Sequence, residues 1–393
     1  MNPFILKPET QAFINQHLNA NIADLILKKS VYTTEDLKLI IEQIEAKKRC
    51  QKKLPTWFNT PNIYYPNKLN IEQTSSKITA QYKASLINGD TLIDLTGGYG
   101  VDCLCFSKKV KNITHCEINE TLSNIVKHNY NVLQADNIKT VFGSGIDYIK
   151  NNLKNYDWIY IDPSRRHDSK GKVFFLNDCL PNVPKHIDLL FSKTNNVLIK
   201  TSPLLDLSIG INELKHVKTI HIVAVNNEVK ELLWVLEQGF NSKINIETVN
   251  IKKDKKDVFN FYLDDEKQAS PAYHLPLNYI YEPNAAILKS GAFNTIAKHL
   301  NVYKLHKHSH LYTSKSDVEF PGRRFKIEAI IPYNKKKLKK LNLTKANITT
   351  RNFPDRVEDI RKKLKIKDGG DTYLFFTTDI NNEKIVVITQ KAK

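Results

Sequence analysis

The sequence is poor in cysteine and in long hydrophobic runs, and each shortage excludes a class of protein. Five cysteines in 393 residues, at positions 50, 103, 105, 116 and 179, are too few and too scattered for a disulfide framework or a zinc site. No apolar run reaches the ~18 residues that a membrane-spanning helix needs. The N-terminus, from Met1 to Lys7, lacks the layout of a signal peptide. We therefore expect a cytoplasmic protein without a metal.

Acidic residues are also scarce, and the resulting positive charge is uneven. The net charge is +18, and residues 271–393 hold 24 lysines and arginines against 11 acids, whereas residues 1–270 hold 35 against 30. The whole chain is rich in Lys, Asn and Ile, so compositional drift is one explanation. Drift does not concentrate charge at one end, however, so the pattern favours a polyanion partner, of which nucleic acid is the usual example.

The most informative stretch is a glycine-rich turn at residues 95–100. The apolar run from Leu92 to Leu95 stops at Gly97, Gly98 and Gly100, and an amphipathic run follows over 101–110. This order predicts a buried strand, a tight turn and the start of a helix. Glycines let the backbone approach a ligand closely, and the N–H groups of the helix N-terminus attract electronegative groups.

The surroundings of this turn specify its ligand. A second predicted strand ends in Glu117, and an acid at this distance accepts hydrogen bonds from the hydroxyls of an adenosine ribose. Cys103 stands where a dinucleotide fingerprint has its third small residue. Asp94 and Asp102 flank the turn and suit a cationic ligand without phosphate, such as S-adenosylmethionine (SAM). The stretch resembles motif I of class I SAM-dependent methyltransferases.

This resemblance implies a set of cofactor-binding residues. The third predicted strand is followed by Ser144, where many of these methyltransferases place an acid against the adenine amine, and Asp147 is then expected in the first turn of a helix. The predicted cofactor-binding residues are Asp94, Thr96, Gly97, Gly98, Gly100, Asp102, Glu117 and Ser144.

Strands and helices are predicted to alternate from 91 to about 226, which is typical of an α/β protein with a parallel sheet. The predicted strands are 91–96, 112–118, 138–143, 157–162, 196–201 and 218–225. The predicted helices are 101–110, 119–134, 146–154, 175–190 and 203–214. Ligands bind such sheets beyond the carboxyl ends of the strands, where the turn and Glu117 are expected. Residues 227–234 fit a helix or a strand equally well.

Asp162-Pro163 follows the fourth predicted strand and is the predicted catalytic pair. A carboxylate and a backbone carbonyl together accept both hydrogens of an exocyclic amine and aim its lone pair at a methyl group. Related enzymes have a second proline and an aromatic next, but Ser164 and Arg165 stand here, so no stacking platform is visible. Arg165, Arg166 and the strand-end Lys200 are predicted to bind substrate phosphate. Pairing of the arginines with surface acids, or a solvated Lys200, are the alternatives.

The flanking regions have their own patterns. Residues 1–55 have helical periodicity, and 69–88 predict one helix whose polar cluster, Glu72 to Ser75, is either a lid over the cofactor or a capped helix start. Beyond 270 we expect a small α+β unit with a helix at 284–300 and a strand at 302–313. That strand would place His306, His308 and His310 on one face, facing solvent or RNA rather than zinc.

The chain as a whole resembles class I SAM-dependent methyltransferases with a C-terminal THUMP-like domain. The resemblance rests on 72–76, 94–102 and 162–166, and on four C-terminal stretches: 281–284, 320–323, 350–354 and 368–373. It implies a Rossmann-like sheet with an N-terminal helical region and a C-terminal α+β part. The implied domains are 1–68 (helical), 69–270 (methyltransferase), 271–321 (ferredoxin-like) and 322–393 (THUMP-like).

The leading hypothesis is therefore SAM-dependent methylation of RNA, tRNA or rRNA, at a base nitrogen. Arg323 and Arg351 of the basic C-terminal unit are predicted to contact the RNA. One alternative is an RNA-binding protein that has lost catalysis, which Ser144 and the missing aromatic suggest. A DNA methyltransferase is another alternative. A nicotinamide dehydrogenase is disfavoured by the incomplete dinucleotide fingerprint.

Overall fold

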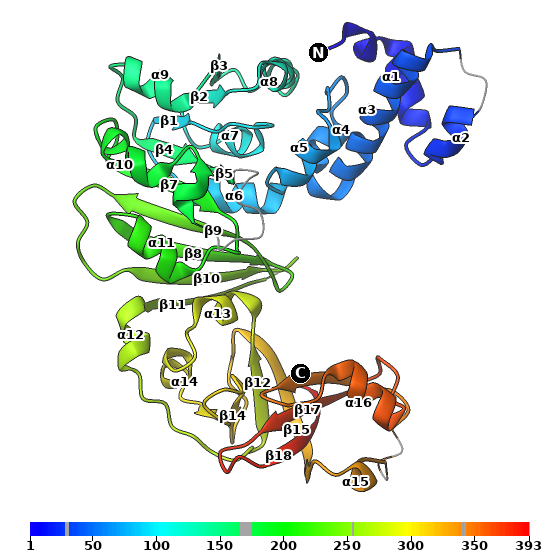
Figure 1. The fold of residues 1–393 in the computed structure, drawn as a ribbon, viewed down its shortest axis with the longest axis vertical. Helices are drawn as coiled ribbons and strands as arrows, with labels where there is room; N and C mark the ends of the chain where they lie inside the picture. Colours follow the sequence, from blue (N-terminus) through cyan, green and yellow to red (C-terminus); the bar gives the residue numbers. More distant parts are fainter. Residues whose placement is uncertain (28–30, 166–174, 254, 340, 342, 393) are drawn as a thin grey trace. The chain divides into compact units, whose positions relative to one another are not determined.

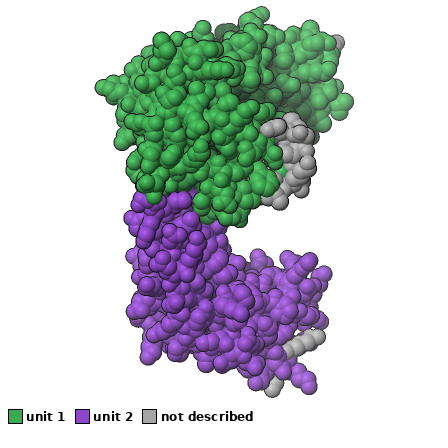
Figure 2. All heavy atoms as spheres, turned by 60° about the vertical axis from the view of Figure 1, so that its left-hand side comes forward, with its two compact units in different colours: residues 1–218, 230–241 green, residues 219–229, 242–393 purple. Residues whose placement is uncertain are grey.

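The computed structural model describes all residues except 28–30, 166–174, 254, 340, 342 and 393. The chain divides into two compact units, shown in separate colours in Figure 2. Unit 1 comprises residues 1–218 and 230–241, and unit 2 comprises residues 219–229 and 242–393. Among the described helices, none has the length and apolar composition needed to cross a bilayer.

Unit 1 begins with the predicted helical region, drawn in blue in Figure 1. Its helices are η1 (Pro3–Leu6), α1 (Pro8–Gln16), α2 (Ile22–Leu27), α3 (Thr34–Lys53) and α4 (Pro55–Asn59). The α3 helix begins where Thr33 accepts a hydrogen bond from the N–H of Asp36. Its buried face carries Leu37, Ile40 and Ile44, so the helical periodicity predicted from the sequence is confirmed.

The prediction of a single helix over 69–88 is wrong, because the helix is interrupted near its start. The structure has α5 (Lys68–Gln73) and α6 (Lys77–Leu86), separated by three residues in extended or turn conformation. Ser76 caps α6 by accepting from the N–H of Thr79, whose hydroxyl accepts from the N–H of Ser76. Short hydroxyl side chains compete in this way with helical hydrogen bonds, which explains why the helix restarts here.

A mostly parallel sheet forms the core of unit 1. Its strands, in spatial order, are β9 (Glu228–Glu237), β7 (Asn196–Thr201), β4 (Trp158–Ile161), β1 (Thr91–Asp94), β2 (Asn112–Glu117) and β3 (Ile138–Phe142). The pairs from β7 to β3 are parallel, whereas β9 runs antiparallel to β7. The ambiguous segment near 227–234 is therefore a strand. The parallel pairing aligns the carboxyl ends of β1, β2, β4 and β7 along one edge.

Helices alternate with these strands as predicted (Figure 1). They are α7 (Val101–Phe106), α8 (Glu120–Val132), α9 (Gly145–Asn151), α10 (Val183–Phe191) and α11 (Leu207–Glu213). The predicted helix over 175–190 starts only at Val183. Residues before it form η3 (Leu176–Asp178) and β6 (Cys179–Leu180), which pairs with β5 (Ser164–Arg165). Asn182 caps α10 and a proline occupies its first turn, so the helix begins at its best start signal.

Unit 2 contains two groups of strands. In the first, β10 (Asn245–Ile251) pairs in parallel with β8 (Val217–Val225) and antiparallel with β11 (Lys256–Tyr262), followed by α12 (Leu263–Gln268). The second is a seven-stranded sheet with the order β13 (Tyr303–Lys304), β14 (Tyr312–Ser314), β12 (Tyr279–Pro283), β15 (Gly322–Pro332), β18 (Lys384–Lys391), β17 (Thr372–Thr378), β16 (Asn347–Arg351). Its helices are α13 (Ala285–Ser290), α14 (Thr295–His299), α15 (Lys335–Lys339) and α16 (Val357–Leu364).

Two predictions for unit 2 are wrong in detail. The helix predicted at 284–300 is broken by Gly291, whose φ of +75° ends α13. The strand predicted at 302–313 is interrupted between β13 and β14, and His306, His308 and His310 lie in that loop. The ring of His306 accepts from the N–H of His308, so the three imidazoles do not alternate along one strand face.

Candidate active site

The turn between β1 and α7 needs glycines for two reasons. Side chains of the protein pack closely against it, and a ligand must be able to approach its backbone. A Cβ on Gly97 would lie 2.2 Å from the His115 ring, and a Cβ on Gly100 would lie 2.3 Å from the Tyr130 hydroxyl. Gly100 also has a φ of +78°, which side chains rarely adopt. His115 is fully buried on β2, and burial lowers its pKa to about 3, so it supports the turn as a neutral ring.

Glu117 lies beside this turn, as the sequence predicts. One carboxylate oxygen accepts from the N–H of Gly98 at 2.9 Å, and the other accepts from the N–H of Asn119 at 2.7 Å. The carboxylate thus joins the turn after β1 to the start of α8. Each oxygen keeps a lone pair for a ligand hydroxyl.

Asp94 and Asp162 are connected through Thr96. Asp94 is buried, and one of its oxygens accepts from the N–H of Thr96 at 2.9 Å. The Thr96 hydroxyl accepts from the N–H of Asp162 at 2.7 Å, so the turn after β1 and the end of β4 are held together. Burial, together with the nearby charges of Asp102 and Asp162, raises the pKa of Asp94 to about 7.

Asp162 forms an ion pair with Lys200. Ile161 and Ile199 are partners in the parallel β4–β7 pair, so the next residue of each strand emerges at the same edge. The Lys200 ammonium lies 2.5 Å from Oδ2 of Asp162. Burial lowers the pKa of Lys200, but the carboxylates of Asp162, Glu231 and Asp102 outweigh burial and raise it above its usual value.

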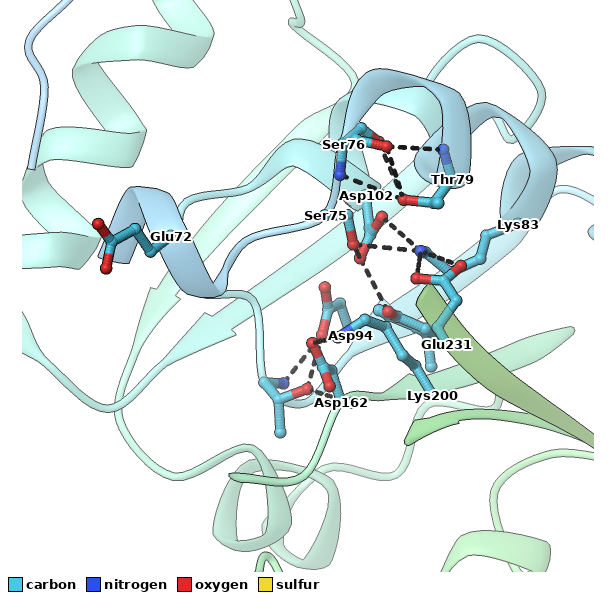
Figure 3. A network of polar contacts seen from close by, with 12 residues as sticks. Glu72, Ser75, Ser76, Thr79, Lys83, Asp94, Asp102, Asp162, Lys200 and Glu231 are labelled. Atoms are coloured by element: carbon cyan, nitrogen blue, oxygen red, sulfur yellow. Dashed lines mark hydrogen bonds and ion pairs between the residues drawn. The ribbon is translucent and has the colours of Figure 1, made fainter. Parts of the chain in front are cut away.

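A second buried cluster lies next to this pair and was not predicted (Figure 3). Lys83 of α6 is fully buried, and its ammonium donates to both Glu231 oxygens at 2.8 Å and to the Ser75 hydroxyl at 3.1 Å. Asp102 lies 3.3 Å from the same ammonium and accepts from the hydroxyls of Ser75 and Tyr160. The available signal was a lysine on the apolar face of α6, since a buried lysine requires a partner acid.

The combined site carries more acids than bases. Its carboxylates belong to Asp94, Asp102, Asp162 and Glu231, and its ammonium groups to Lys83 and Lys200. Four acids against two bases leave two negative charges in excess when all are ionised. A cationic ligand fits such a site electrostatically, whereas a pyrophosphate does not. Asp102 itself is bound within the cluster by Lys83, Ser75 and Tyr160.

The sheet edge beside Glu117 is apolar and exposed. Phe142 is paired with Glu117 in register and is 59% exposed, and Ile118, next after Glu117, is 73% exposed. An open cavity of about 660 Å³ borders Phe142 and Ser144. Ser144 caps α9 by accepting from the N–H of Asp147, which lies in the first turn as predicted. Ile118 and Phe142 were missed because exposed apolar residues carry no periodicity signal.

The structure does not bring every predicted residue to this edge. Pro163 is buried next to Asp162, and Arg165 lies in β5, but Arg166 falls outside the described residues. Arg323 and Arg351 belong to unit 2. There Arg323 Nε lies 2.6 Å and Arg351 Nη2 2.9 Å from the carboxylate of Glu282, so both predicted RNA contacts are engaged with one buried acid.

Comparisons with known proteins match the C-terminal region to two families. Residues 322–391 match the THUMP domain-like family, and residues 279–321 match a ferredoxin-like domain family. A search of curated proteins gives no match.

Solved structures extend the likeness to the whole chain. A protein from Porphyromonas gingivalis W83, assigned to the methyltransferases, is 32% identical, with a TM-score of 0.90 over 100% of this chain and 99% of that one. TrmK of M. capricolum, solved with S-adenosylhomocysteine, is 17% identical, with a TM-score of 0.32 over 42% of this chain and 69% of its own. An rRNA methylase from Streptococcus thermophilus is 12% identical, with a TM-score of 0.31 over 41% and 93%.

The last two likenesses are too slight to support an argument, but the first covers both chains almost completely. The fold, the C-terminal family matches and this relative agree with one another. The chain therefore belongs to the methyltransferases that carry a C-terminal THUMP-like domain.

Proposed function

We propose that the protein transfers a methyl group from SAM to a base nitrogen of RNA, with tRNA or rRNA as the substrate class. The observation that carries this proposal is the Thr96 bridge, which holds Asp94 of the cofactor turn and Asp162 of the acceptor motif in one hydrogen-bonded unit. The proposed cofactor turn and the proposed acceptor motif thus lie at the same sheet edge.

The residues at this edge fit SAM. Glu117 offers lone pairs to the ribose hydroxyls, the turn of Gly97, Gly98 and Gly100 leaves its backbone accessible, and the acid excess favours the ammonium and sulfonium groups. Ile118 and Phe142 offer apolar surface to the adenine, next to Ser144. Asp102 is assigned to the supporting cluster, because protein groups already engage its carboxylate.

Asp162 and Pro163 would orient the acceptor. The Asp162 oxygen that Lys200 does not contact and the carbonyl of Pro163 would each accept a hydrogen from an exocyclic amine, which aims the nitrogen lone pair outward from the pair. SAM supplies an electrophilic methyl group when it is bound. Methyl transfer would form the nitrogen–carbon bond and break the carbon–sulfur bond, which would release S-adenosylhomocysteine, and Asp162 or water would take the proton that the nitrogen loses.

RNA is proposed as the acceptor because of the C-terminal charge and the THUMP-like match. Residues 271–393 carry 24 basic residues against 11 acids, and phosphate backbones bind such surfaces. The second candidate, an RNA-binding protein that transfers no methyl, is favoured by Ser164 and Arg165, which replace the proline and aromatic of related sites.

Two measurements test the proposal in sequence. Calorimetry with SAM should show micromolar-range binding, of about 1–100 μM, that Glu117→Ala abolishes. Mass spectrometry of nucleosides from wild-type and gene-deleted cells should then show one methylated nucleoside lost, in RNA and not in DNA. Complementation by the wild type, but not by Asp162→Asn, should restore it. Absence of SAM binding overturns the proposal, and a nucleoside lost from DNA reassigns the substrate. SAM binding with unchanged nucleosides supports the second candidate.

A further inference from the structure

Among the residues that the structure describes, the Asp162–Lys200 ion pair engages one of the two carboxylate oxygens. The ammonium contacts Oδ2 alone, at 2.5 Å, and among the described residues no hydrogen bond to Oδ1 is found. The lysine side chain is 15% exposed and the aspartate 32%, so the pair lies at the mouth of the site with the aspartate as its more open member. The free oxygen is therefore the one available to an arriving group.

The charges around Lys200 show why Asp162 needs it. Glu231 from β9 and Asp102 from α7 are the other acids that act on the ammonium, and Lys53 near the end of α3 is the nearby base. Lys83 already binds both Glu231 oxygens and lies beside Asp102. Lys200 thus supplies a counter-ion to Asp162, in a site that also holds the acids Asp94, Asp102 and Glu231.

Its engagement also argues against a phosphate contact. A lysine that reaches RNA phosphate projects into solvent, with its ammonium hydrated and mobile. The Lys200 ammonium is instead held against Asp162 by a short charge-assisted hydrogen bond. A phosphate would have to compete with that carboxylate for the same ammonium.

We propose that Lys200 is a positioning residue of the transfer reaction: it holds Oδ2 of Asp162 in place, so that Oδ1 points to the acceptor amine. This inference rests on the proposed function. Lys200 acts through Asp162 and touches neither the acceptor nor SAM. Removing the Lys200 ammonium should therefore lower kcat while the affinities for RNA and for SAM stay nearly unchanged.

The test uses the full-length protein, labelled SAM and total RNA from gene-deleted cells. Lys200→Met keeps the length of the side chain and removes its charge, and Lys200→Arg keeps the charge. The matched control is Lys218→Met, which removes an equally short but exposed pair with Glu237. Each variant is measured for kcat, RNA KM and SAM affinity. Melting temperatures identify any variant that is unfolded, in which case Lys200→Arg carries the test.

Lys200→Met should lose about 100-fold in kcat, with RNA KM and SAM affinity changed by less than about threefold. Lys200→Arg should recover part of the loss, and in an Asp162→Asn background Lys200→Met should add little. Lys218→Met should match the wild type.

Other outcomes overturn the inference. A rise in RNA KM with unchanged kcat, and a salt dependence reduced by about one charge, would make Lys200 a phosphate contact. A Lys200→Met protein that equals the wild type overturns the inference alone. A wild type that binds SAM but transfers no methyl overturns the proposed function and this inference with it.

Discussion

Two clusters of ion pairs differ in the sign of their excess charge. The acidic cluster of unit 1 consists of Asp94, Asp102, Asp162, Glu231, Lys83 and Lys200. The arginine cluster of unit 2 consists of Glu282, Arg323 and Arg351. In unit 1, Lys83 and Lys200 face four carboxylates. In unit 2, Arg323 and Arg351 share the single buried carboxylate of Glu282. The first cluster therefore retains negative charge and the second positive charge.

The proposed function needs one chain to bind ligands of both signs, and the two clusters differ in the sign that each would favour. An acid excess in a buried site favours a compact cation, and a base excess on partly exposed side chains favours a polyanion. The clusters also differ in burial, since Lys83 is fully buried while Arg323 is 43% and Arg351 32% exposed. Removing one charge from each cluster should therefore change the unfolding free energy by amounts that differ in size and in sign.

The largest effect is expected for Lys83→Met, which removes a cation from the acid-rich cluster. Glu231 would be left buried without its partner, and burial already raises the pKa of this acid. Loss of one member of such a pair costs about 3–5 kcal/mol of unfolding free energy. Urea denaturation at pH 7 measures it, with Lys111→Met as the control, since Lys111 forms an exposed pair with Asp90. An unchanged midpoint would show that the cluster is not stabilising.

Asp94→Asn should raise the unfolding free energy, whereas Lys83→Met should lower it, because Asp94→Asn removes an acid from the same acid-rich cluster. Folding raises the pKa of Asp94 from 3.8 to about 7, so the ionised carboxylate destabilises the folded protein when no ligand is bound. That cost is absent below about pH 4 and reaches about 4 kcal/mol above pH 7. Asp94→Asn should therefore be more stable than the wild type at pH 8 and equal to it at pH 4.

Calorimetry completes this prediction. Wild-type SAM affinity should increase as pH rises through about 7, because a cation binds the ionised acid better. The Asp94→Asn protein should bind SAM weakly and without this pH dependence. The exposed Asp90→Asn serves as the matched control. Stability lower than the wild type at pH 8 would contradict the acid excess.

In unit 2, removing an acid should destabilise. Glu282→Gln leaves Arg323 and Arg351 without their shared counter-ion. Because both arginines are partly exposed, water recovers some of the loss, and we expect about 1–3 kcal/mol. The control is Glu319→Gln, an exposed partner of Lys255. If Asp94→Asn and Glu282→Gln changed the unfolding free energy in the same direction at pH 8, the two clusters would not differ in the sign of their excess charge.

The parts of this site that follow a local pattern were predictable from the sequence. The glycine turn, Glu117 and Asp162 each follow an apolar strand, and parallel strands bring their ends together. Lys83 and Glu231 were not predictable, because 148 residues separate them and only tertiary packing joins α6 to β9. The ion pair of Lys200 depends in the same way on the β4–β7 register.

The fold errors have local causes. Side-chain capping by Ser76 and the left-handed Gly291 interrupt segments whose apolar periodicity continues across the break. In both cases the hydrophobic pattern was correct, but the backbone ended the helix for reasons that periodicity does not contain. Similarly, the loop between β13 and β14 holds the three histidines although their alternate spacing is typical of a strand.

The smallest effect is expected where exposed bases are removed from unit 2. Lys336, Lys337 and Lys339 of α15 are exposed, so their substitution by glutamine should not change the unfolding free energy. If they face RNA phosphate, affinity should fall a few-fold for each charge, and the salt dependence of binding should weaken by about 0.7–0.9 for each lysine. Filter binding across a salt series measures both effects. The matched control substitutes the exposed Lys38, Lys109 and Lys111 of unit 1. An equal loss in both triple variants would mean that net charge alone, and not the base excess of unit 2, attracts the RNA.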